Sequence, residues 1–337
     1  MKLGVLAFFT TLALVGAPLI SLGQFSTERT FELEVAPRYP APGEPVHIYA
    51  ETYSFDIARA QVRWQVDGVP YREGRGVRSI TLLAPQAHET KVVSFSATLG
   101  GETLSRSITI APVIIDLILE PQTYVPPFYP GKALVSHRSQ VRAVALPELR
   151  TPGGALYAPE ALSFTWRING DTRGELSGPG RSVITFSAGP LSRSTTVEVE
   201  VVSLDGLRAG RTSTTVPSIA PQPLLYAVSP LAGPDYAKAL GSGTVLEEDE
   251  VTILAEPFYA RGIRRDVLQT EYSWSLNGRS VATTNTDPGT ITLRQAGAGR
   301  GRATIGVSVT DPSEVLARAS AVATFIFGRE GRGIFGF

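Results

Sequence analysis

Hydrophobic and polar residues alternate along several short stretches of the chain. Every second residue is apolar in residues 162–168 (LSFTWRI), 197–201 (VEVEV) and 305–309 (IGVSV). A period of two places one face of a β-strand against a core and the other face in water. No stretch shows a convincing amphipathic helix, because proline and glycine interrupt most candidates. The pattern therefore predicts an all-β protein.

The three tryptophans, Trp64, Trp166 and Trp274, mark an internal repeat. They are 102 and 108 residues apart, and each is followed by Asp-Gly or Asn-Gly, then by an Ile-Thr-Leu or Ile-Thr-Phe triplet, then by a second alternating strand. Three features in the same order at this spacing indicate three copies of one small β-domain. The copies comprise residues 62–68, 80–82 and 91–98, then 164–170, 184–186 and 196–202, and finally 272–278, 291–293 and 303–310.

Each copy has the strand density of a two-sheet sandwich. Roughly six to eight short strands separated by turn residues are expected per repeat, which is typical of immunoglobulin-like sandwiches. Asp-Gly or Asn-Gly after each tryptophan strand favours a tight hairpin turn. We expect tandem sandwiches at residues 25–111, 112–220 and 221–328, followed by a Gly/Arg-rich tail at 329–337. The proline-containing junctions at 111–112 and 217–223 are short, so the connections should be semi-rigid.

These motifs resemble those of a known group. The W-x-[VIL]-[DN]-G strand, the strand TVEVEVVSLDG at 196–206 and the P-x-P-G-E turn at 40–44 are similar to immunoglobulin-like and polycystic-kidney-disease (PKD) repeats of bacterial surface proteins. PKD repeats typically carry Gly-Asp-Gly after the tryptophan strand, whereas only Asp67-Gly68, Asn169-Gly170 and Asn277-Gly278 are found in this chain. The resemblance implies extracellular display, adhesion or spacing, and it does so by analogy of fold.

The N-terminus has the features of an export signal. Lys2 precedes an apolar stretch at residues 3–20, and Ser21-Leu22-Gly23 offers small residues for cleavage before Gln24. Residues 1–23 are therefore expected to be a signal peptide, although the apolar stretch is also just long enough to remain as an uncleaved membrane anchor. Either way the protein is expected to be exported to the cell envelope, the cell surface or the medium.

Composition excludes several classes of function. The chain has 31 basic and 31 acidic residues, no cysteine and three histidines. Zero net charge argues against a dedicated nucleic-acid binder, and the absence of cysteine excludes disulfides, thiol catalysis and attachment of a lipid to cysteine. No nucleophile elbow, zinc-binding His-Glu-x-x-His or phosphate-binding loop is present, so we expect no enzyme activity, no cofactor and no metal.

Aromatic residues supply the candidate binding sites. Trp64, Trp166 and Trp274 lie on the apolar side of their strands and are expected in the core. The proline-flanked pairs Phe128/Tyr129 and Phe258/Tyr259 have two interpretations. They form an exposed platform for a glycan or peptide, or they cover a sandwich edge or the joint between domains.

Two further patterns have simple alternatives. Lys132 and Lys238 recur at similar places in the second and third copies, and with Asn169 and Asn277 they suggest an isopeptide crosslink. Shared ancestry of a solvent-facing lysine is the better explanation, because a turn accounts fully for Asn-Gly. The acidic run at residues 247–250 precedes a strand and suggests a calcium site, but acidic runs of this kind are usually solvated turns. The tail suggests a docking peptide or a frayed end.

From these observations we expect a non-catalytic envelope protein with structural, adhesive or protein-interaction roles. Its partners would be envelope or surface proteins, and it would contact a membrane only through the N-terminal segment if that segment is uncleaved. A carbohydrate-binding accessory protein that uses the Pro-aromatic loops is the alternative, and it requires those aromatics to be exposed. A secreted hydrolase would require a carboxylate-lined cleft.

Overall fold

The computed structural model describes residues 30–127, 129–190, 192–261, 270–283, 286–297, 300–310 and 318–328. The predicted signal peptide at 1–23 and the tail at 329–337 lie outside the described residues. The chain divides into two compact units, Met1–Ala36 with Val46–Leu82 and Val92–Thr109, and Pro37–Pro45 with Leu83–Lys91 and Ile110–Phe337. Among the described residues, no helix is long and apolar enough to cross a membrane.

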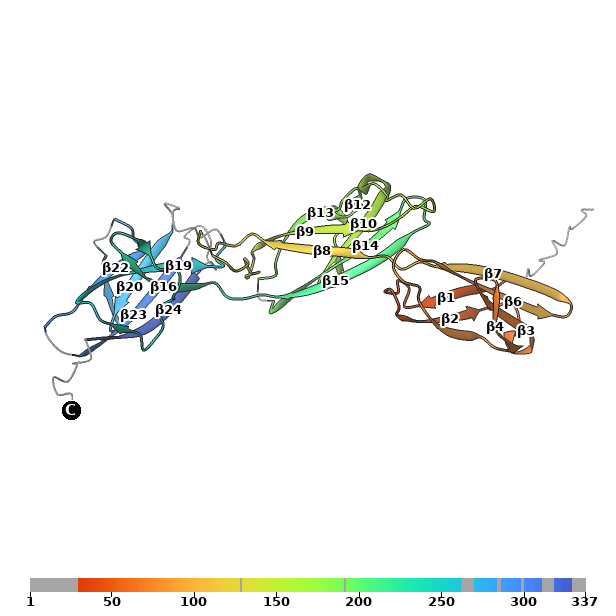
Figure 1. The fold of residues 1–337 in the computed structure, drawn as a ribbon, viewed down its shortest axis with the longest axis horizontal. Coiled ribbons are helices and arrows are strands. Elements are labelled where there is room, and N and C mark those ends of the chain that lie inside the picture. Colours follow the sequence, from red (N-terminus) through yellow and green to blue (C-terminus); the bar gives the residue numbers. More distant parts are fainter. Residues whose placement is uncertain are drawn as a thin grey trace, which may run out of the picture. The chain divides into compact units, whose positions relative to one another are not determined.

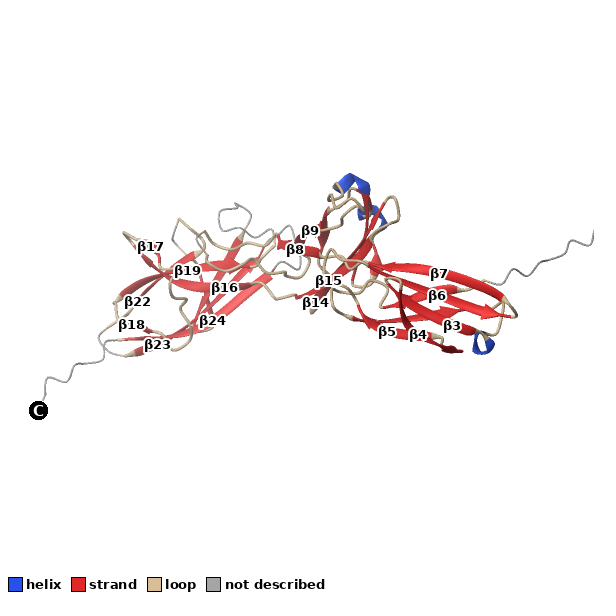
Figure 2. Ribbon diagram, turned by 45° about the vertical axis from the view of Figure 1, so that its right-hand side comes forward, coloured by secondary structure: helices blue, strands red, loops and turns tan. Residues whose placement is uncertain are grey.

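The protein is all-β, as predicted, and consists of tandem β-sandwiches (Figure 1). The described residues contain six sheets, which follow one another in pairs along the sequence. Apart from strands and loops, the described chain has only short 3-10 turns at Ile57–Arg59, Pro159–Ala161 and Gly174–Leu176 (Figure 2).

The first pair of sheets contains seven strands. The smaller sheet has the order β1-β2-β5, and the larger has the order β4-β3-β6-β7. Their bounds are β1 Glu32–Ala36, β2 Pro45–Glu51, β3 Gln61–Val66, β4 Val69–Arg75, β5 Ser79–Leu83, β6 Lys91–Leu99 and β7 Glu102–Ile110.

The second pair repeats this arrangement. One sheet has the order β13-β9-β8, and the other has β11-β10-β14-β15, with β12 also paired to β10. The bounds are β8 Ile115–Pro121, β9 Gln140–Pro147, β10 Leu162–Ile168, β11 Asp171–Thr172, β12 Gly178–Pro179, β13 Val183–Ser187, β14 Ser194–Ser203 and β15 Ala209–Pro217.

The third pair has the orders β17-β16-β19-β22 and β18-β24-β23-β20-β21. The bounds are β16 Gln222–Ser229, β17 Gly233–Pro234, β18 Val245–Leu246, β19 Glu250–Phe258, β20 Glu271–Leu276, β21 Arg279–Val281, β22 Thr290–Arg294, β23 Gly301–Thr310 and β24 Arg318–Phe327.

The same strand pairing recurs in all three pairs of sheets. Each tryptophan strand pairs with the later alternating strand of its copy, so that Trp64 is opposite Phe95, Trp166 opposite Val199 and Trp274 opposite Val307. The strand with the Ile-Thr triplet lies in the opposite sheet, as β5, β13 or β22. The two halves of each motif therefore face one another across a core.

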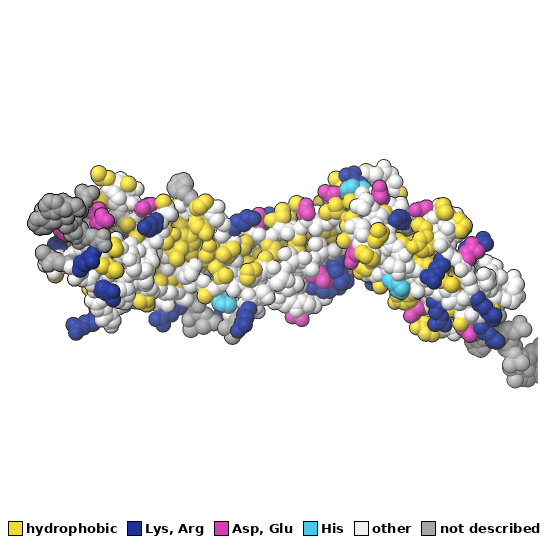
Figure 3. Space-filling view, turned by 60° about the horizontal axis from the view of Figure 1, so that its bottom comes forward, with side chains coloured by type: hydrophobic (Ala, Val, Ile, Leu, Met, Phe, Trp, Pro, Cys, Tyr) yellow, Lys and Arg dark blue, Asp and Glu magenta, His cyan; other side chains and the backbone are white. Residues whose placement is uncertain are grey.

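The cores follow the alternation in the sequence. In the second pair, Leu162, Phe164, Trp166 and Ile168 are buried, whereas the residues between them are half-buried. Val197, Val199 and Val201 of β14 pack into the same cluster. On the face drawn in Figure 3, acidic and basic side chains of the described residues are interspersed, in keeping with the zero net charge of the chain.

Candidate functional site

Each tryptophan makes the same hydrogen bond in its own core. The indole Nε1 of Trp64 donates to the carbonyl oxygen of Val77 at 2.9 Å. Trp166 donates to Arg181 at 2.8 Å, and Trp274 donates to the carbonyl of Pro288 at 3.0 Å. The three side chains are 0, 0 and 2% exposed. Because a buried N–H needs an acceptor, this bond lets a large ring fill the core and ties the strand to the loop before the next sheet.

The turn after each tryptophan strand also recurs. Asp67, Asn169 and Asn277 have φ of 51°, 53° and 50°, and each precedes a glycine of positive φ, as the turn prediction requires. Each side-chain Oδ1 accepts a hydrogen bond from a backbone N–H at the start of the later strand, at 2.8, 2.9 and 2.9 Å. Lys132 and Lys238 are exposed. This shared role accounts for the recurring asparagines without a crosslink.

An aromatic cluster surrounds one end of β19. Phe258 at the end of β19, the adjacent Tyr259 and Tyr226 of β16 form its buried centre. Ring centroids lie 5.1 Å apart for Tyr129 and Phe258, and 5.7 Å apart for Phe258 and Tyr259. Tyr129 belongs to the segment between β8 and β9, so residues of the second repeat pack against strands of the third. We call Tyr124, Tyr129, Tyr226, Tyr236, Glu256, Phe258 and Tyr259 the aromatic joint.

Backbone hydrogen bonds hold the β8–β9 segment to the end of β19. The N–H of Tyr124 donates to the carbonyl of Ala260 at 3.0 Å, and the N–H of Tyr259 donates to the carbonyl of Tyr124 at 2.7 Å. Two bonds between the same short stretches continue the pairing of β19 for one more step. The contact is therefore made by backbone as well as by side chains.

Glu256 is a fully buried carboxylate within this joint. Its side chain is 0% exposed, and its two oxygens accept hydrogen bonds from Tyr124 Oη at 2.8 Å and Tyr236 Oη at 2.6 Å. Burying a charge is costly unless hydrogen bonds replace its hydration. Tyr124 and Tyr236 supply these bonds from different parts of the chain. The joint is therefore held by defined polar contacts as well as by the packing of its rings.

The hydroxyl groups of Tyr129 and Tyr259 lie 3.0 Å apart. Burial raises the pKa of Tyr259 to about 12, and the hydrogen bond with Tyr129 adds to the effect. Burial also raises the pKa of Tyr226. Tyr226 and Tyr259 therefore remain neutral at physiological pH, as packing in an apolar cluster requires.

The predicted binding aromatics must be reassessed on this geometry. Phe258 is 1% exposed and Tyr259 is 7% exposed, so the expectation of an exposed platform at these two residues is wrong. Their rings pack against Tyr129 and Tyr226 instead of facing solvent. Tyr129 is half-buried in the same cluster, whereas Phe128 lies outside the described residues. The alternative interpretation, that these aromatics cover a joint, describes what Tyr129, Phe258 and Tyr259 do.

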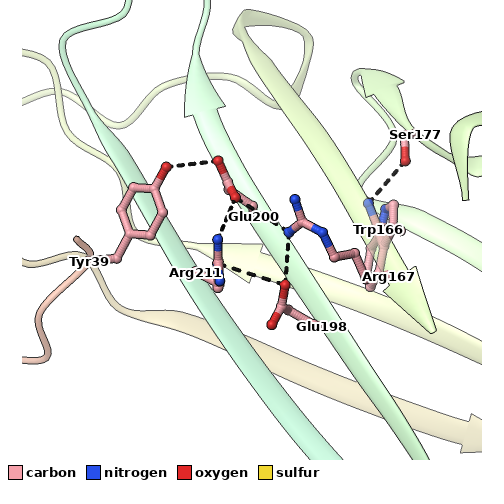
Figure 4. Close-up of polar contacts among 7 residues, drawn as sticks. All are labelled: Tyr39, Trp166, Arg167, Ser177, Glu198, Glu200 and Arg211. Atoms are coloured by element: carbon pink, nitrogen blue, oxygen red, sulfur yellow. Dashed lines mark hydrogen bonds and ion pairs between the residues drawn. The ribbon is translucent and has the colours of Figure 1, made fainter. Parts of the chain in front are cut away.

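A second organised site is a polar network on the outer face of β10, β14 and β15 (Figure 4). Arg167 donates to Glu198 at 2.8 Å and to Glu200 at 3.4 Å, and Arg211 donates to Glu200 at 3.0 Å. Cross-strand pairing brings these residues together, because Arg167 is opposite Glu198 and Glu200 is opposite Arg211. Opposite charges at such positions stabilise a sheet.

Tyr39 completes this network. Its hydroxyl donates to Glu200 Oε1 at 2.7 Å, and the Arg211 guanidinium lies 5.4 Å from the centre of its ring. Tyr39 belongs to the segment Pro37–Pro45, which is grouped with the second unit. We call Tyr39, Arg167, Glu198, Glu200 and Arg211 the Glu200 network.

The hydrogen bonds of the Glu200 network favour the ionised form of the Glu200 carboxyl group. Burial alone would raise the pKa of Glu200, but the hydrogen bonds from Tyr39, Arg211 and Arg167 outweigh burial and lower it. Burial and the bond to Glu200 raise the pKa of Tyr39. The hydrogen bond to Glu198 is the main cause of the raised pKa of Arg167. The network is thus a set of ion pairs with a neutral phenol at one end.

The sequence pointed to Tyr129, Phe258 and Tyr259 as residues that could cover a joint, but it identified neither Glu256 in that joint nor the Glu200 network. The alternation of residues 197–201 places Glu198 and Glu200 outward, but nothing in the sequence shows that Tyr39 reaches them. Glu256 lies between apolar residues in β19 without any motif. The acidic run at 247–250 is exposed, and its Glu250 forms an ion pair with Arg294. The described residues contain no group of three or more His, Asp or Glu side chains that could hold a metal ion.

Comparisons with known proteins give likenesses of fold only. No protein-family model matches the chain, and no curated protein matches it. Three N-terminal domains of the outer capsid protein Hoc of bacteriophage RB49 are 12% identical, covering 90% of this chain and 99% of that chain with a TM-score of 0.23. A central fibronectin-III array of RIM-binding protein is 13% identical, covering 89% and 96% with a TM-score of 0.29.

A third solved structure is SGBP-B of the Bacteroides ovatus mixed-linkage glucan utilization locus, in complex with a mixed-linkage heptasaccharide. It is 14% identical, covering 88% of this chain and 70% of that chain, with a TM-score of 0.23. At such identities and scores, similarity gives no information on ligands or partners.

Proposed function

We propose that this protein is an exported, non-catalytic component of the cell envelope whose tandem sandwiches serve a structural or protein-interaction role. The observation that carries the proposal is the aromatic joint. Its aromatic rings and the Glu256 carboxylate contact one another, and Tyr226, Glu256, Phe258 and Tyr259 are buried. Groups organised in this way suit a spacer that holds a partner-binding surface in place, and they leave no reacting group free for a substrate.

The apolar segment at residues 3–20 supports export, and the resemblance to repeats of bacterial surface proteins supports a location at the envelope or cell surface. Envelope or surface proteins would be the partners. The interspersed charges of the surface fit contacts with other proteins better than contacts with nucleic acid.

Fractionation of native cells tests this proposal, with the N-terminus of the recovered protein determined by mass spectrometry. A chain that starts near Gln24 in the medium or the wall fraction supports a cleaved, exported protein. A chain that retains Met1 and sediments with membranes supports an anchored spacer. A cytoplasmic location would refute the proposed function and leave only the fold.

A joint variant tests the spacer role itself. Tyr124→Phe removes one hydrogen bond to Glu256 and keeps the ring, so the sandwiches should remain folded while the joint loosens. We expect faster proteolysis in the β8–β9 segment than in the wild type. Tyr157→Phe is the matched control, because its hydroxyl bonds to the exposed Asp205. Equal rates of proteolysis in the two variants would contradict the claim that the bond between Tyr124 and Glu256 holds the joint together.

Carbohydrate binding through the Pro-aromatic loops is the alternative function. It requires Phe258 and Tyr259 to be accessible, and their burial argues against it. A hydrolase would need a carboxylate-lined cleft. The two most enclosed carboxylates described above, Glu200 and Glu256, are occupied by tyrosine and arginine side chains.

A further inference from the structure

We propose that a surface groove on the first unit binds a neutral carbohydrate chain by stacking sugar rings on Tyr49 and Tyr53. The groove lies along β2 and the start of β5 and has a volume of ≈ 320 Å³. This volume is near the lower end of the roughly 300–1,000 Å³ that is usual for small-molecule sites. Its lining includes His47, Tyr49, Glu51, Tyr53, Arg78 and Ser79.

Tyr53 is the first reason for the proposal. Its side chain is 98% exposed, although a tyrosine ring usually gains free energy by burial. Both neighbours are hydrogen-bonded to Thr30, since Thr52 Oγ1 donates to its carbonyl at 2.7 Å and Ser54 Oγ accepts from its N–H at 2.7 Å. The loop is therefore fixed while the ring is presented to solvent. Because the loop is already held, a ligand that stacks on Tyr53 does not have to order the backbone there.

Tyr49 is the second reason. It is half-buried on β2, and its hydroxyl donates to Glu34 at 2.5 Å, which fixes the ring in the groove. The imidazole of His47 is 6.1 Å from the Tyr49 ring with an angle of 32° between the planes. Residues two apart on a strand share a face, so the two rings form a row along the groove. A row of rings suits a chain of sugars better than a single small molecule.

The polar groups favour an uncharged sugar. Glu51 accepts from the Tyr53 hydroxyl at 3.4 Å, and it shares the groove with Arg78 and the Ser79 hydroxyl. Carboxylate, guanidinium and hydroxyl groups offer acceptors and donors in one place, which matches the paired hydroxyl groups of a hexose. Because both signs of charge line the groove, neither a polyanion nor a strongly basic peptide is complementary to it.

This inference goes beyond the proposed function and does not depend on it. The groove lies in the first unit and shares no residue with the aromatic joint. Such a site would attach a spacer protein to a polysaccharide of the envelope or of another surface. Failure of glycan binding would leave the spacer role intact, and a cytoplasmic location would leave glycan binding measurable.

The test is native affinity electrophoresis of the full chain from Gln24, in gels containing mixed-linkage β-glucan, xylan or galactomannan, together with sedimentation on cellulose and chitin. We expect retardation or co-sedimentation with at least one of these neutral polymers. Tyr53→Ala should weaken it by roughly tenfold, because one stacking contact is lost. Tyr53→Phe should retain it, since the ring remains.

Tyr71→Ala is the matched control, because Tyr71 is an exposed tyrosine of β4 outside the groove lining. It should bind like the wild type. Circular dichroism and tryptophan emission, to which Trp64 of the first sandwich contributes, should be unchanged in both alanine variants, which would show that the first sandwich stays folded. The proposal is overturned if none of the polymers is bound, if Tyr53→Ala binds normally, or if Tyr71→Ala weakens binding equally. Retention by heparin or by a basic peptide in place of neutral polymers would also overturn it.

Discussion

The buried carboxylate of Glu256 allows a quantitative prediction. Tyr236→Phe removes the hydroxyl that donates to Glu256 Oε1 at 2.6 Å, but it keeps the ring that lies 5.1 Å from the ring of Tyr226. Packing is therefore preserved, and a hydrogen bond to a buried acceptor is lost. Leaving a buried acceptor without a hydrogen-bond partner costs about 1–3 kcal/mol of stability.

The expected effect follows from this value. With a urea dependence of about 1–3 kcal/mol per molar for a small domain, the midpoint of unfolding should fall by about 1 M. The assay is equilibrium unfolding in urea followed by tryptophan emission, in a background that carries Trp64→Phe and Trp166→Phe. Trp274 is 2% exposed and is then the reporter of the third sandwich.

Tyr157→Phe is the control for this measurement. This variant also removes a tyrosine hydroxyl that donates to a carboxylate, at 2.5 Å from Asp205 Oδ2, but this hydrogen bond is exposed to solvent. An exposed substitution should change stability by no more than about 0.5 kcal/mol. Trp166 is the reporter in that case, with the other two tryptophans replaced. Equal midpoint shifts for the two variants would refute the argument that burial of Glu256 gives its hydrogen bonds their value.

Two other predictions concern the repeated turn and the Glu200 network. Asn169→Asp should be tolerated, because Asp67 has the same positive φ and the same hydrogen bond in the first repeat. Asn169→Ala should lower the free energy of unfolding by about 1–2 kcal/mol, because alanine disfavours positive φ. Thermal unfolding of both variants measures the difference, and similar losses of stability would contradict the prediction. The lowered pKa of Glu200 means that its contribution to stability is present above the unfolded pKa of about 4.3 and is lost as pH falls through the folded value. Tyr39→Phe should therefore make the urea midpoint less dependent on pH between about pH 5 and 3; curves parallel to those of the wild type would show that Tyr39 does not influence Glu200.

The core could be predicted from the sequence because it depends on local alternation. The residues of β10 alternate strictly, so the position of Trp166 in the core follows from period two alone. The Asn-Gly and Asp-Gly turns were predicted for the same reason, since positive φ is a property of the residues themselves. The carbonyl partners of the tryptophans were not predicted, because they lie 13 to 15 residues away in loops without a pattern.

Alternation fails in β19, where the most informative site lies. All residues from Ile253 to Phe258 in this strand are buried. One face, with Ile253 and Ala255, packs into the core of the third sandwich, and Phe258 packs into the aromatic joint. A strand covered on both faces has no exposed side, so its sequence cannot show which residue meets a distant segment.

The sequence by itself determined the all-β class and the internal repeat, because hydrophobic periodicity and turn residues are local properties. Only the tertiary structure decided what the polar and aromatic residues contact. Tyr124 and Glu256 are 132 residues apart, and Tyr39 and Glu200 are 161 apart. Such contacts depend on how segments pack after the strands have formed, and no local pattern of charge or hydrophobicity records them.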